Sequence, residues 1–383
     1  MLSIKNGVKS LADIINREIY RVLKLIRGLT RNRFNAAYFS DMISTNINRL
    51  IKNEFILNPK EHLYIEVSNI CNLRCRFCGY SKTSNKKLIM SNGMFFDIIN
   101  KATAFGYDTF GLTPITGEVF IDKNFITKLK FLENHPKVKN YSFYTNFTLA
   151  NEEIIDWLIE AKKLKELSIS IYGHDYDSFS AITGSNEKTY NNLISNLNYL
   201  LKRCKKKKIK LRFSLRTYTS FNTLEECKSE LCHILMTLIK ITKSKILIPK
   251  VQNTWGGYIT QDDVKGLDII IGDATKIYKN GACLLIFYKN QVLVDGRINA
   301  CACRDINATL KIGDLQNQTF DEIYSINNKD YKNLIDSQQK GDFNPICENC
   351  DFYRSIYKKY NYFTRYKKKP LTLEIFYQNL SRK

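Results

Sequence analysis

Cys71-Asn72-Leu73-Arg74-Cys75-Arg76-Phe77-Cys78, followed by Gly79, is the stretch of the sequence that decides the fold. Its three cysteines directly follow the strand-like run 63–68. Thiolates this close together can converge on one metal centre, and cysteine thiolates hold iron–sulfur clusters. A closed structural zinc site needs four ligands, so three cysteines indicate a centre with one open position. A zinc knuckle completed by a histidine such as His62 is the alternative.

The composition indicates a two-domain protein of the reducing cytosol. A chain of 383 residues, 44% of them hydrophobic, can hold a domain of roughly 200–250 residues and a smaller one. No apolar run is long enough to span a membrane. Charged residues (Lys5, Lys9, Asp13, Arg17 and Glu18) interrupt any signal-peptide core near the N-terminus. Eleven cysteines without an export signal favour metal binding over disulfides, so we expect a cytoplasmic location.

The net charge of +22 suits an anionic partner, such as a phosphate-bearing substrate, a nucleic acid or a membrane surface. However, Lys, Asn, Ile and Tyr are all abundant, as in proteins from AT-rich genomes, so codon usage explains part of the charge. No RNA-binding motif of aromatic and basic residues is evident. We therefore do not expect a nucleic-acid partner.

Residues 1–60 have a basic, helical pattern. Apolar residues recur at helical spacing with Arg and Lys between them, and a second such pattern runs from 39 to 56, before Pro59. A basic amphipathic helix can lie on a membrane surface, but it more often packs on its own protein. The first pattern consists of Leu11, Ile14, Ile15, Ile19, Val22, Leu23 and Ile26.

Residues 61–250 alternate between strand and helix patterns. Such repeats predict a parallel sheet with right-handed crossovers, and six of them suit a partial (β/α)6 barrel, an α/β fold. The predicted strands are 63–68, 108–114, 141–146, 166–172, 209–216 and 245–249. The predicted helices are near 91–105, 122–133, 150–163, 187–204 and 223–240.

Polar and apolar side chains alternate along these strands, so each strand has one polar face. In a barrel ringed by helices the apolar face must meet the helices, which leaves the polar face for the interior. A polar interior indicates an open barrel that holds a polar ligand, since closed barrels fill with branched apolar side chains. An antiparallel sheet with one wet face fits poorly with helices between the strands. The polar set includes Tyr64, Glu66, Ser68, Thr109, Gly111, Thr113, Ser168, Ser170, Tyr172, Arg212, Ser214 and Arg216.

The cysteine loop, with Phe77 before its third cysteine, resembles the cluster-binding loop of the radical SAM enzymes. The resemblance implies that Cys71, Cys75 and Cys78 hold three irons of a [4Fe–4S] cluster. The fourth iron would be chelated by the amino and carboxylate groups of S-adenosylmethionine (SAM). An electron from a flavodoxin or ferredoxin would then cleave SAM to a 5′-deoxyadenosyl radical.

Three strand ends carry further motifs, where ligands bind in such folds. Thr116-Gly117-Glu118 stands where the family usually has Gly-Gly-Glu, and the resemblance implies that these residues bind the SAM amino group. Thr145-Asn146 is similar to Thr-Asn-Gly, and Ser170-Ile171-Tyr172-Gly173 to Ser-x-Asp-Gly. By that resemblance Asn146 and Ser170 lie near the SAM ribose or carboxylate.

The chain departs from the family pattern at three places. Phe147 replaces the glycine, Tyr172 replaces the aspartate, and residues 182–184 lack the arginine that binds the SAM carboxylate in many relatives. Arg212 or Arg216 could take the place of that arginine. The alternative for both is a solvated strand end.

A second cysteine set lies in the C-terminal part. Cys283, a hairpin pattern, Cys301, a helical pattern and Cys347-Glu348-Asn349-Cys350 follow one another. This order resembles the SPASM/twitch domain, which implies that Cys283, Cys301, Cys347 and Cys350 bind one auxiliary [4Fe–4S] cluster. No cysteine follows Cys350, which favours the short twitch form. Structural zinc is the alternative. Outside both sets, Cys204, Cys227 and Cys232 lie in helical patterns and are expected to be buried.

The resemblance covers residues 61–352. We expect a helical extension (1–60), a radical SAM barrel (61–250), a SPASM/twitch domain (251–352) and a basic tail (353–383). The extension is too short for the peptide-binding domain of many peptide-modifying relatives.

Cys303 is left over near the auxiliary set. Because it is two residues beyond Cys301, its side chain points the same way if the chain is extended there. A spare ligand, a buried filler and a thiol that returns a hydrogen atom to the substrate radical are all open interpretations.

These features together predict a radical SAM oxidoreductase or epimerase that acts on a small, anionic, carbohydrate-like substrate. The enzymatic alternative is a maturase of a ribosomal peptide or protein. The non-enzymatic alternative is a nucleic-acid-binding protein stabilised by zinc or a cluster.

Overall fold

The computed structural model describes residue 18 and residues 33–113, 115–205, 209–360 and 369–381. The helix predicted from residues 11–26 therefore lies outside the described residues, apart from residue 18. In the large sheet of the described chain seven strands pair in parallel, and the six predicted from the sequence are all among them. Their spatial order is β9 (Gln291–Val292), β1 (Leu63–Ile65), β2 (Thr109–Gly111), β3 (Asn140–Thr145), β4 (Leu164–Tyr172), β5 (Leu211–Arg216) and β6 (Lys245–Leu247).

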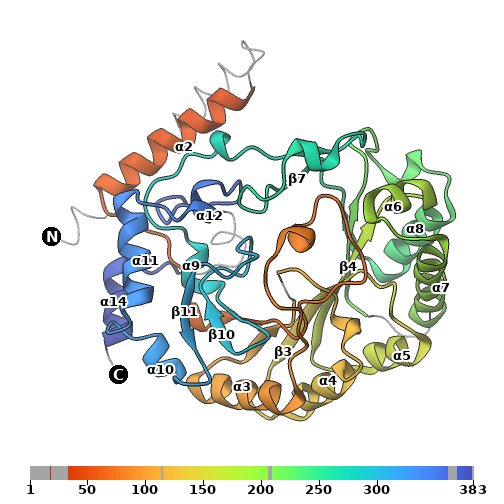
Figure 1. The fold of residues 1–383 in the computed structure, drawn as a ribbon, viewed down its shortest axis with the longest axis horizontal. Helices are drawn as coiled ribbons and strands as arrows, with labels where there is room; N and C mark the ends of the chain where they lie inside the picture. Colours follow the sequence, from red (N-terminus) through yellow and green to blue (C-terminus); the bar gives the residue numbers. More distant parts are fainter. Residues whose placement is uncertain (1–17, 19–32, 114, 206–208, 361–368, 382–383) are drawn as a thin grey trace.

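Helices cover the outer face of this curved sheet, and the segment that carries the cysteine loop lies inside the curve (Figure 1). They are α3 (Asn92–Phe105), α4 (Phe125–Asn134), α5 (Glu152–Glu160), α6 (Tyr176–Thr183), α7 (Glu187–Cys204) and α8 (Glu230–Thr242). The eight-residue α6 was not predicted. Its local signals are an Asp175 capping box at its start and Gly184 in the left-handed conformation at its end.

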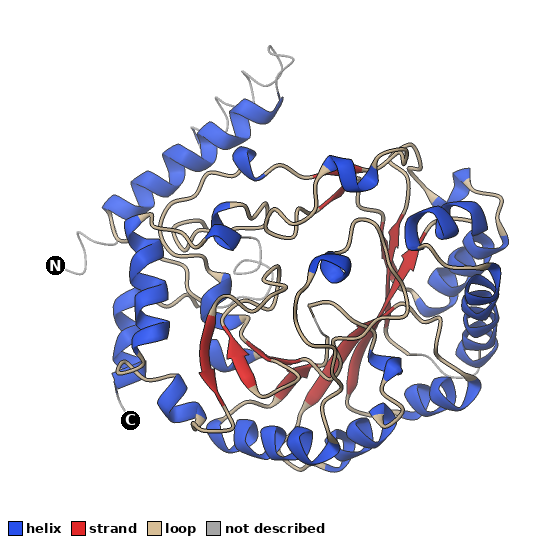
Figure 2. Cartoon of the chain, in the orientation of Figure 1, coloured by secondary structure: helices blue, strands red, loops and turns tan. Residues whose placement is uncertain are grey.

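The C-terminal part extends the same sheet. β10 (Arg297–Asn299) pairs antiparallel with β9 and with β11 (Lys311–Asp314), and β9 pairs in parallel with β1. The described sheet thus has nine strands, with β6 and β11 at its edges, and is an open, partial barrel as predicted. Figure 2 shows these strands as one curved layer with helices along its outer side.

Shorter elements complete the described chain. A separate two-stranded sheet pairs β7 (Val251–Gln252) with β8 (Ile270–Ile271). The C-terminal helices are α9 (Leu285–Tyr288), α10 (Phe320–Ile323), α11 (Lys329–Lys340) and α12 (Pro345–Glu348). The 3-10 turns are η1 (Pro59–Glu61), η2 (Gly79–Lys82), η3 (Val119–Ile121), η4 (Leu224–Glu226), η5 (Gln261–Val264) and η6 (Ala274–Lys276).

Side chains alternate along the strands as predicted: apolar ones pack under the helices, and those of the other face point into the barrel. Leu63, Ile65 and Val67 are fully buried, as are the equivalent residues of β4 and β5. Residues of the other face, among them Tyr64 and Ser170, line a cavity inside the barrel. The three cysteines expected to be buried outside both sets, Cys204, Cys227 and Cys232, are buried.

The first and the last described helices, α2 and α14, both pack on the C-terminal part. The Asn48 side chain of α2 (Arg33–Leu50) donates to the Tyr357 carbonyl at 2.8 Å. Phe376 of α14 (Leu373–Ser381) meets the Phe287 ring edge-on at 4.9 Å. α2 ends at Leu50, earlier than the predicted 56. None of the described helices combines the length and the apolar character that crossing a membrane requires.

Candidate active site

The cysteine loop is fixed by its backbone. The N–H groups of Arg74 and Arg76 donate to the carbonyls of Thr183 and Ile182, at 3.1 and 2.9 Å. The segment in which many relatives have a SAM-binding arginine therefore supplies carbonyl acceptors that hold the loop. This contact positions the cysteines independently of any bound metal.

A tryptophan from the C-terminal part of the chain contacts the loop on its other side. The indole N–H of Trp255 donates to the Phe77 carbonyl at 2.8 Å. A Cβ atom at Gly79 would stand 2.8 Å from the Ile306 side chain, so only glycine fits there without a shift. The loop is therefore packed between the barrel and the C-terminal part.

The three thiols of the loop face one cavity of about 320 Å³. Burial raises the pKa of each, that of Cys71 to about 12, where Glu118 adds to the effect. Buried thiols of this kind lose their protons when a metal supplies positive charge. The donor set therefore fits a metal centre.

The three thiols of the loop lie around the cavity and do not converge on one point. Among the residues that the structure describes, no three His, Cys, Asp or Glu side chains are placed to hold one metal ion. A cluster of four irons is wider than a single ion, so thiolates spread around a cavity can each reach a different iron.

Glu118 lies beside the loop, but its carboxylate is largely engaged within the protein. It accepts hydrogen bonds from the Thr145 hydroxyl (2.6 Å) and from the backbone N–H groups of Asn146 (2.6 Å) and Phe120 (3.2 Å). Burial raises its pKa to about 7. Glu118 therefore ties the end of β3 to the loop after β2, while the neighbouring Thr116 and Gly117 also line the cavity.

Asn146 connects the strand end to the cysteine loop. Its side-chain amide donates to Asn72 Oδ1 at 2.9 Å and lies 4.0 Å from Cys71 Sγ. The next residue, Phe147, has φ 62°, the left-handed region that suits the glycine of the family pattern. The chain keeps that backbone shape with a phenylalanine whose ring is fully buried.

Ser170, Tyr172 and Arg216 also line the cavity. Arg216 Nη1 donates to the Ser170 hydroxyl at 3.3 Å, and its guanidinium lies 5.8 Å from the centre of the Tyr172 ring. The Tyr172 ring lies 5.9 Å from that of Phe77. Burial raises the pKa of Tyr172, so this residue is a neutral phenol rather than a counterpart of the family's aspartate.

Arg212 does not reach this site. It lies at the beginning of β5, half exposed, and pairs with Glu166 at 2.9 Å. It is absent from the described residues that line the cavity, whereas Arg216 at the end of the strand is present. Of the two arginines considered from the sequence, the structure brings only Arg216 to the cysteine loop.

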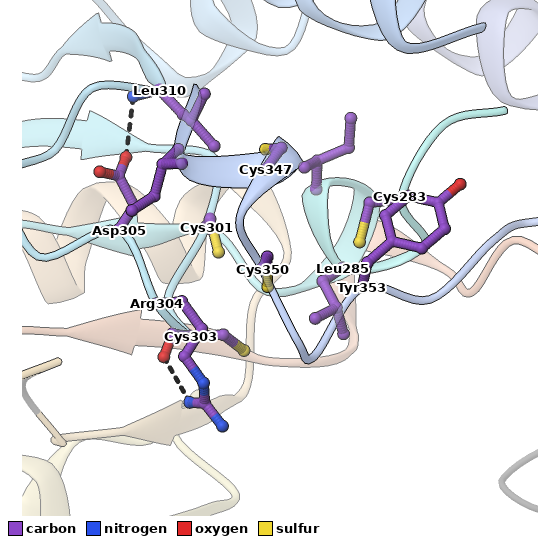
Figure 3. A pocket seen from close by; sticks show the side chains of 12 residues that line it. Cys283, Leu285, Cys301, Cys303, Arg304, Asp305, Leu310, Cys347, Cys350 and Tyr353 are labelled. Carbon is purple, nitrogen blue, oxygen red and sulfur yellow. Dashed lines mark hydrogen bonds between the residues drawn. The ribbon is translucent and has the colours of Figure 1, made fainter. Parts of the chain in front are cut away.

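The second cysteine set assembles from distant segments. Cys283, Cys301, Cys303, Cys347 and Cys350 line one small cavity of about 20 Å³ (Figure 3). Leu285, Ile286, Leu310 and Ile346 make its surroundings apolar. Burial raises the pKa of Cys283 to about 12 and also raises that of Cys347 and Cys350.

Amide groups already point at these sulfurs. Gln338 Nε2 donates to Cys347 Sγ at 3.3 Å, and the Phe352 N–H donates to Cys350 Sγ at 3.3 Å. Gln338, fully buried, also accepts from the Cys283 N–H at 2.8 Å. Hydrogen bonds to sulfur tune iron–sulfur clusters, so these contacts also fit a cluster.

Cys303 belongs to both cavities, because it lines the small one and also the cavity that the loop cysteines face. The contact with the Cys301 thiol and the positive charge of Lys289 lower its pKa to about 5. The sequence alone drew attention to Cys303 but not to its position between the two cysteine sets.

Several lining residues were missed from the sequence. Lys289, Arg304, Trp255 and Phe352 line the larger cavity, and Gln338 holds the second cysteine set. No motif marks Lys289 or Gln338. Trp255 does precede two consecutive glycines, and Arg304 directly follows Cys303, so these two positions carried a weak signal.

Two family models match the chain. The model of the radical SAM superfamily matches residues 65–215, and that of the SPASM iron–sulfur cluster-binding domain matches residues 283–351. A search of curated proteins finds no match. The matched ranges contain all seven cysteines expected to bind clusters.

Three solved structures are similar to the chain, and the first of them shares its fold. BtrN in complex with AdoMet and 2-DOIA has a TM-score of 0.50 and 13% identity, covering 79% of this chain and 97% of BtrN. The protein anSMEcpe with bound AdoMet has a TM-score of 0.49 and 16% identity, covering 84% and 91%. Streptococcus suis SuiB bound to its precursor peptide SuiA has a TM-score of 0.46 and 16% identity, covering 86% and 78%.

The resemblance found in the sequence is thereby confirmed. A radical SAM domain uses a SAM-binding [4Fe–4S] cluster, SAM and an external reductant. A SPASM domain binds auxiliary iron–sulfur clusters. The chain is therefore a radical SAM enzyme with a C-terminal SPASM-type iron–sulfur domain.

Proposed function

We propose that this enzyme removes a hydrogen atom from a small, anionic, carbohydrate-like molecule and thereby oxidises or epimerises it. The observation that carries the proposal is the charge of the cavity that the loop cysteines face. Arg216, Lys289 and Arg304 line it, and Glu118 is the single carboxylate among its described lining residues. With three cationic side chains and one carboxylate, the described lining of the cavity carries a net positive charge.

Cys71, Cys75 and Cys78 would hold the SAM-binding cluster, and Cys283, Cys301, Cys347 and Cys350 the auxiliary one. When bound, the first cluster and SAM would supply a 5′-deoxyadenosyl radical that takes a hydrogen atom from a substrate C–H bond. For oxidation, the auxiliary cluster would supply the acceptor for the second electron, and the accompanying proton would go to solvent. The residues of the chain bind and orient the ligands and exclude water.

The strand ends would hold SAM. Thr116, Gly117 and Glu118 are assigned to its amino group, and Arg216 with Ser170 to its carboxylate. Asn146, fixed on Asn72, is assigned to the nearby ribose or carboxylate. A guanidinium is suited to a carboxylate because its planar fork can donate two parallel hydrogen bonds.

Cys303 is assigned as a hydrogen-atom donor in the epimerisation variant of this function. Because the pKa of Cys303 is lowered, its thiolate would first take up a proton from solvent. The S–H bond would then break as a C–H bond forms on the opposite face of the substrate carbon. The sulfur radical left behind would then take one electron from the flavodoxin or ferredoxin reductant and one proton from solvent. Its place between the two cysteine sets supports the assignment, since it lines both cavities.

The test of the substrate class uses reconstituted full-length protein, SAM and reduced flavodoxin. We expect sugar phosphates or nucleotide sugars to stimulate 5′-deoxyadenosine formation, and deuterium from the labelled substrate to enter that product. Stimulation by ribosomal peptides and by no anionic small molecule would overturn the proposal in favour of a maturase.

The Cys303→Ala variant separates oxidation from epimerisation. Loss of turnover and of solvent deuterium in the product, with clusters and SAM cleavage intact, is expected for a donor. Loss of auxiliary iron would make Cys303 a ligand instead, and full activity would make it a filler.

A further inference from the structure

We propose that Arg304, together with Lys289, forms the subsite that binds an oxyanion of the substrate, a carboxylate or a phosphoryl group. The inference rests on the proposed function, because it names the residues by which the anionic substrate is held. It places the charged end of the substrate against the second cysteine set, away from the SAM motifs.

Arg304 is held rigidly but uses few of its donors. Its guanidinium lies 4.5 Å from the centre of the Phe352 ring and 5.5 Å from that of Trp255. Nη1 donates to the Cys303 carbonyl at 2.6 Å, a contact visible in Figure 3. Its Nε is buried and has no hydrogen-bond partner among the described residues.

Leaving Arg304 Nε buried and unpaired costs free energy when no ligand is bound. A buried donor that is left unpaired loses hydration and gains nothing in return. Arginine carries five N–H donors in a planar fork, which suits carboxylate and phosphate oxygens. Because the aromatic rings fix the plane of the fork, an oxyanion in the cavity would meet a preorganised partner.

Lys289 adds a second positive charge to the same cavity. Its ammonium lies 5.5 Å from the centre of the Tyr64 ring, and its half-buried side chain lines the cavity. No described Asp or Glu lies within ion-pairing distance of Lys289. This ammonium also favours the thiolate of the neighbouring Cys303. In a partly buried cavity it still attracts a further anion more strongly than a fully solvated ammonium would.

Arg216 serves a different part of the cavity. It is anchored on Ser170 and lies over Tyr172, at the end of β5 and beside the cysteine loop. Its position suits the SAM carboxylate, which leaves Arg304 and Lys289 for the substrate. The alternative role for Arg304 is to balance the charge of the auxiliary cluster, because this residue also lines the small cavity.

The experiment measures anion binding directly, on full-length protein with both clusters reconstituted and SAM saturating. Inorganic phosphate and acetate are titrated separately by calorimetry at low ionic strength. We expect saturable binding of at least one of them, and Arg304→Gln and Lys289→Gln should each weaken it about tenfold or more. The two titrations distinguish a phosphoryl from a carboxylate subsite.

Arg354→Gln is the matched control. The Arg354 guanidinium lies 4.7 Å from the same Phe352 ring and 5.0 Å from the Tyr360 ring, but it does not line the cavity. This variant should bind the anions as the wild type does. Iron content and visible absorbance are recorded for every variant, so that cluster loss is not mistaken for lost anion binding.

The proposal is overturned if neither anion binds saturably to the wild type, or if both variants bind like the wild type. Lost iron with unchanged anion binding would assign Arg304 to the auxiliary cluster and also overturn it. Anion binding that depends on Arg304, in a protein that no anionic small molecule stimulates, would retain the subsite and refute the proposed function.

Discussion

The two cysteine sets reach their positions in opposite ways. The first set lies within eight consecutive residues, 71–78, and faces a cavity of about 320 Å³. The second is spread from Cys283 to Cys350 and surrounds a cavity of about 20 Å³. The first set is therefore organised by one loop, whereas the second exists only when the C-terminal part has folded.

This difference predicts different consequences when metal is lost. The loop is held by backbone contacts to Thr183 and Ile182 that require no thiolate. The second set connects α9, the end of β10 and α12, so metal bound there would cross-link three segments. Metal binding at such a site is coupled to folding.

The largest effect is expected from the loop. Replacing Cys71, Cys75 and Cys78 together by Ala should abolish SAM cleavage, because no thiolate is left to hold the SAM-binding cluster. Iron should fall from about eight to about four atoms per chain, since the auxiliary cluster stays. Chromatography of 5′-deoxyadenosine and iron analysis check both. Cys204→Ala, a buried cysteine of α7 far from both sets in sequence, is the control. Retained cleavage would break the assignment of the loop.

The second set should instead govern stability. Cys347→Ala should lower Tm by roughly 5–10 °C, because one cross-link between segments is lost. The loop variant should change Tm much less. Thermal unfolding followed by circular dichroism under anaerobic conditions provides the measurement. Equal changes of Tm in the two variants would show that metal binding at the second set stabilises the fold no more than metal binding at the loop.

The junction between the two regions should respond to pH. Glu66, at the end of β1, accepts a hydrogen bond from the Val294 N–H of the C-terminal part at 3.2 Å. Burial raises its pKa to about 7 from 4.5. The folded protein then binds more protons than the unfolded one between these values, so the free energy of unfolding falls as pH rises, by up to about 3 kcal/mol.

Glu66→Gln isolates this effect, because the amide cannot ionise but keeps an acceptor for Val294. The stability of the wild type relative to the variant should fall from about pH 5 to about pH 7 and stay constant above it. Chemical unfolding at several pH values measures the slope. A slope of opposite sign, or none, would show that the carboxylate is already ionised in the folded state.

The smallest effect is expected from a matched arginine pair. Arg216→Gln should weaken SAM binding about tenfold, through loss of a charge-assisted contact. Arg212→Gln should leave SAM binding unchanged and alter stability by no more than about 1 kcal/mol, because its pair with Glu166 is partly exposed. Equilibrium binding of SAM compares them. Equal weakening by both would place Arg212 at the site after all.

The sequence predicted what depends on local pattern. Strands β4 and β5 alternate clearly, and the first cysteine set has its spacing within one loop, so both were recognisable. β9 has only two residues, Gln291 and Val292, and two residues cannot show a period. Its parallel pairing with β1 therefore had no signal.

The height of a residue along the barrel axis, that is, whether it lies at the end of the strand that meets the cavity, was also not predictable. Alternation assigns Arg212 and Arg216 to the same face, but it does not say which end of the strand meets the cavity. Similarly, a glutamate at position 118 indicated a carboxylate at the site. The hydrogen bonds that Thr145 and Asn146 donate to it come from the end of another strand and could not be predicted. Lys289 reaches the cavity through tertiary structure alone.

The pairing of β9 with β1 has a consequence for dissecting the protein. A shortened chain that ended before Cys283 would keep every residue of the loop and of the SAM motifs, yet β1 would lose one neighbour. The backbone N–H groups of Tyr64 and Glu66, which donate to Asn290 and Val292, would then be unpaired on an apolar strand. Such an edge is a template for intermolecular pairing, so the truncated enzyme should aggregate rather than form a minimal catalytic unit.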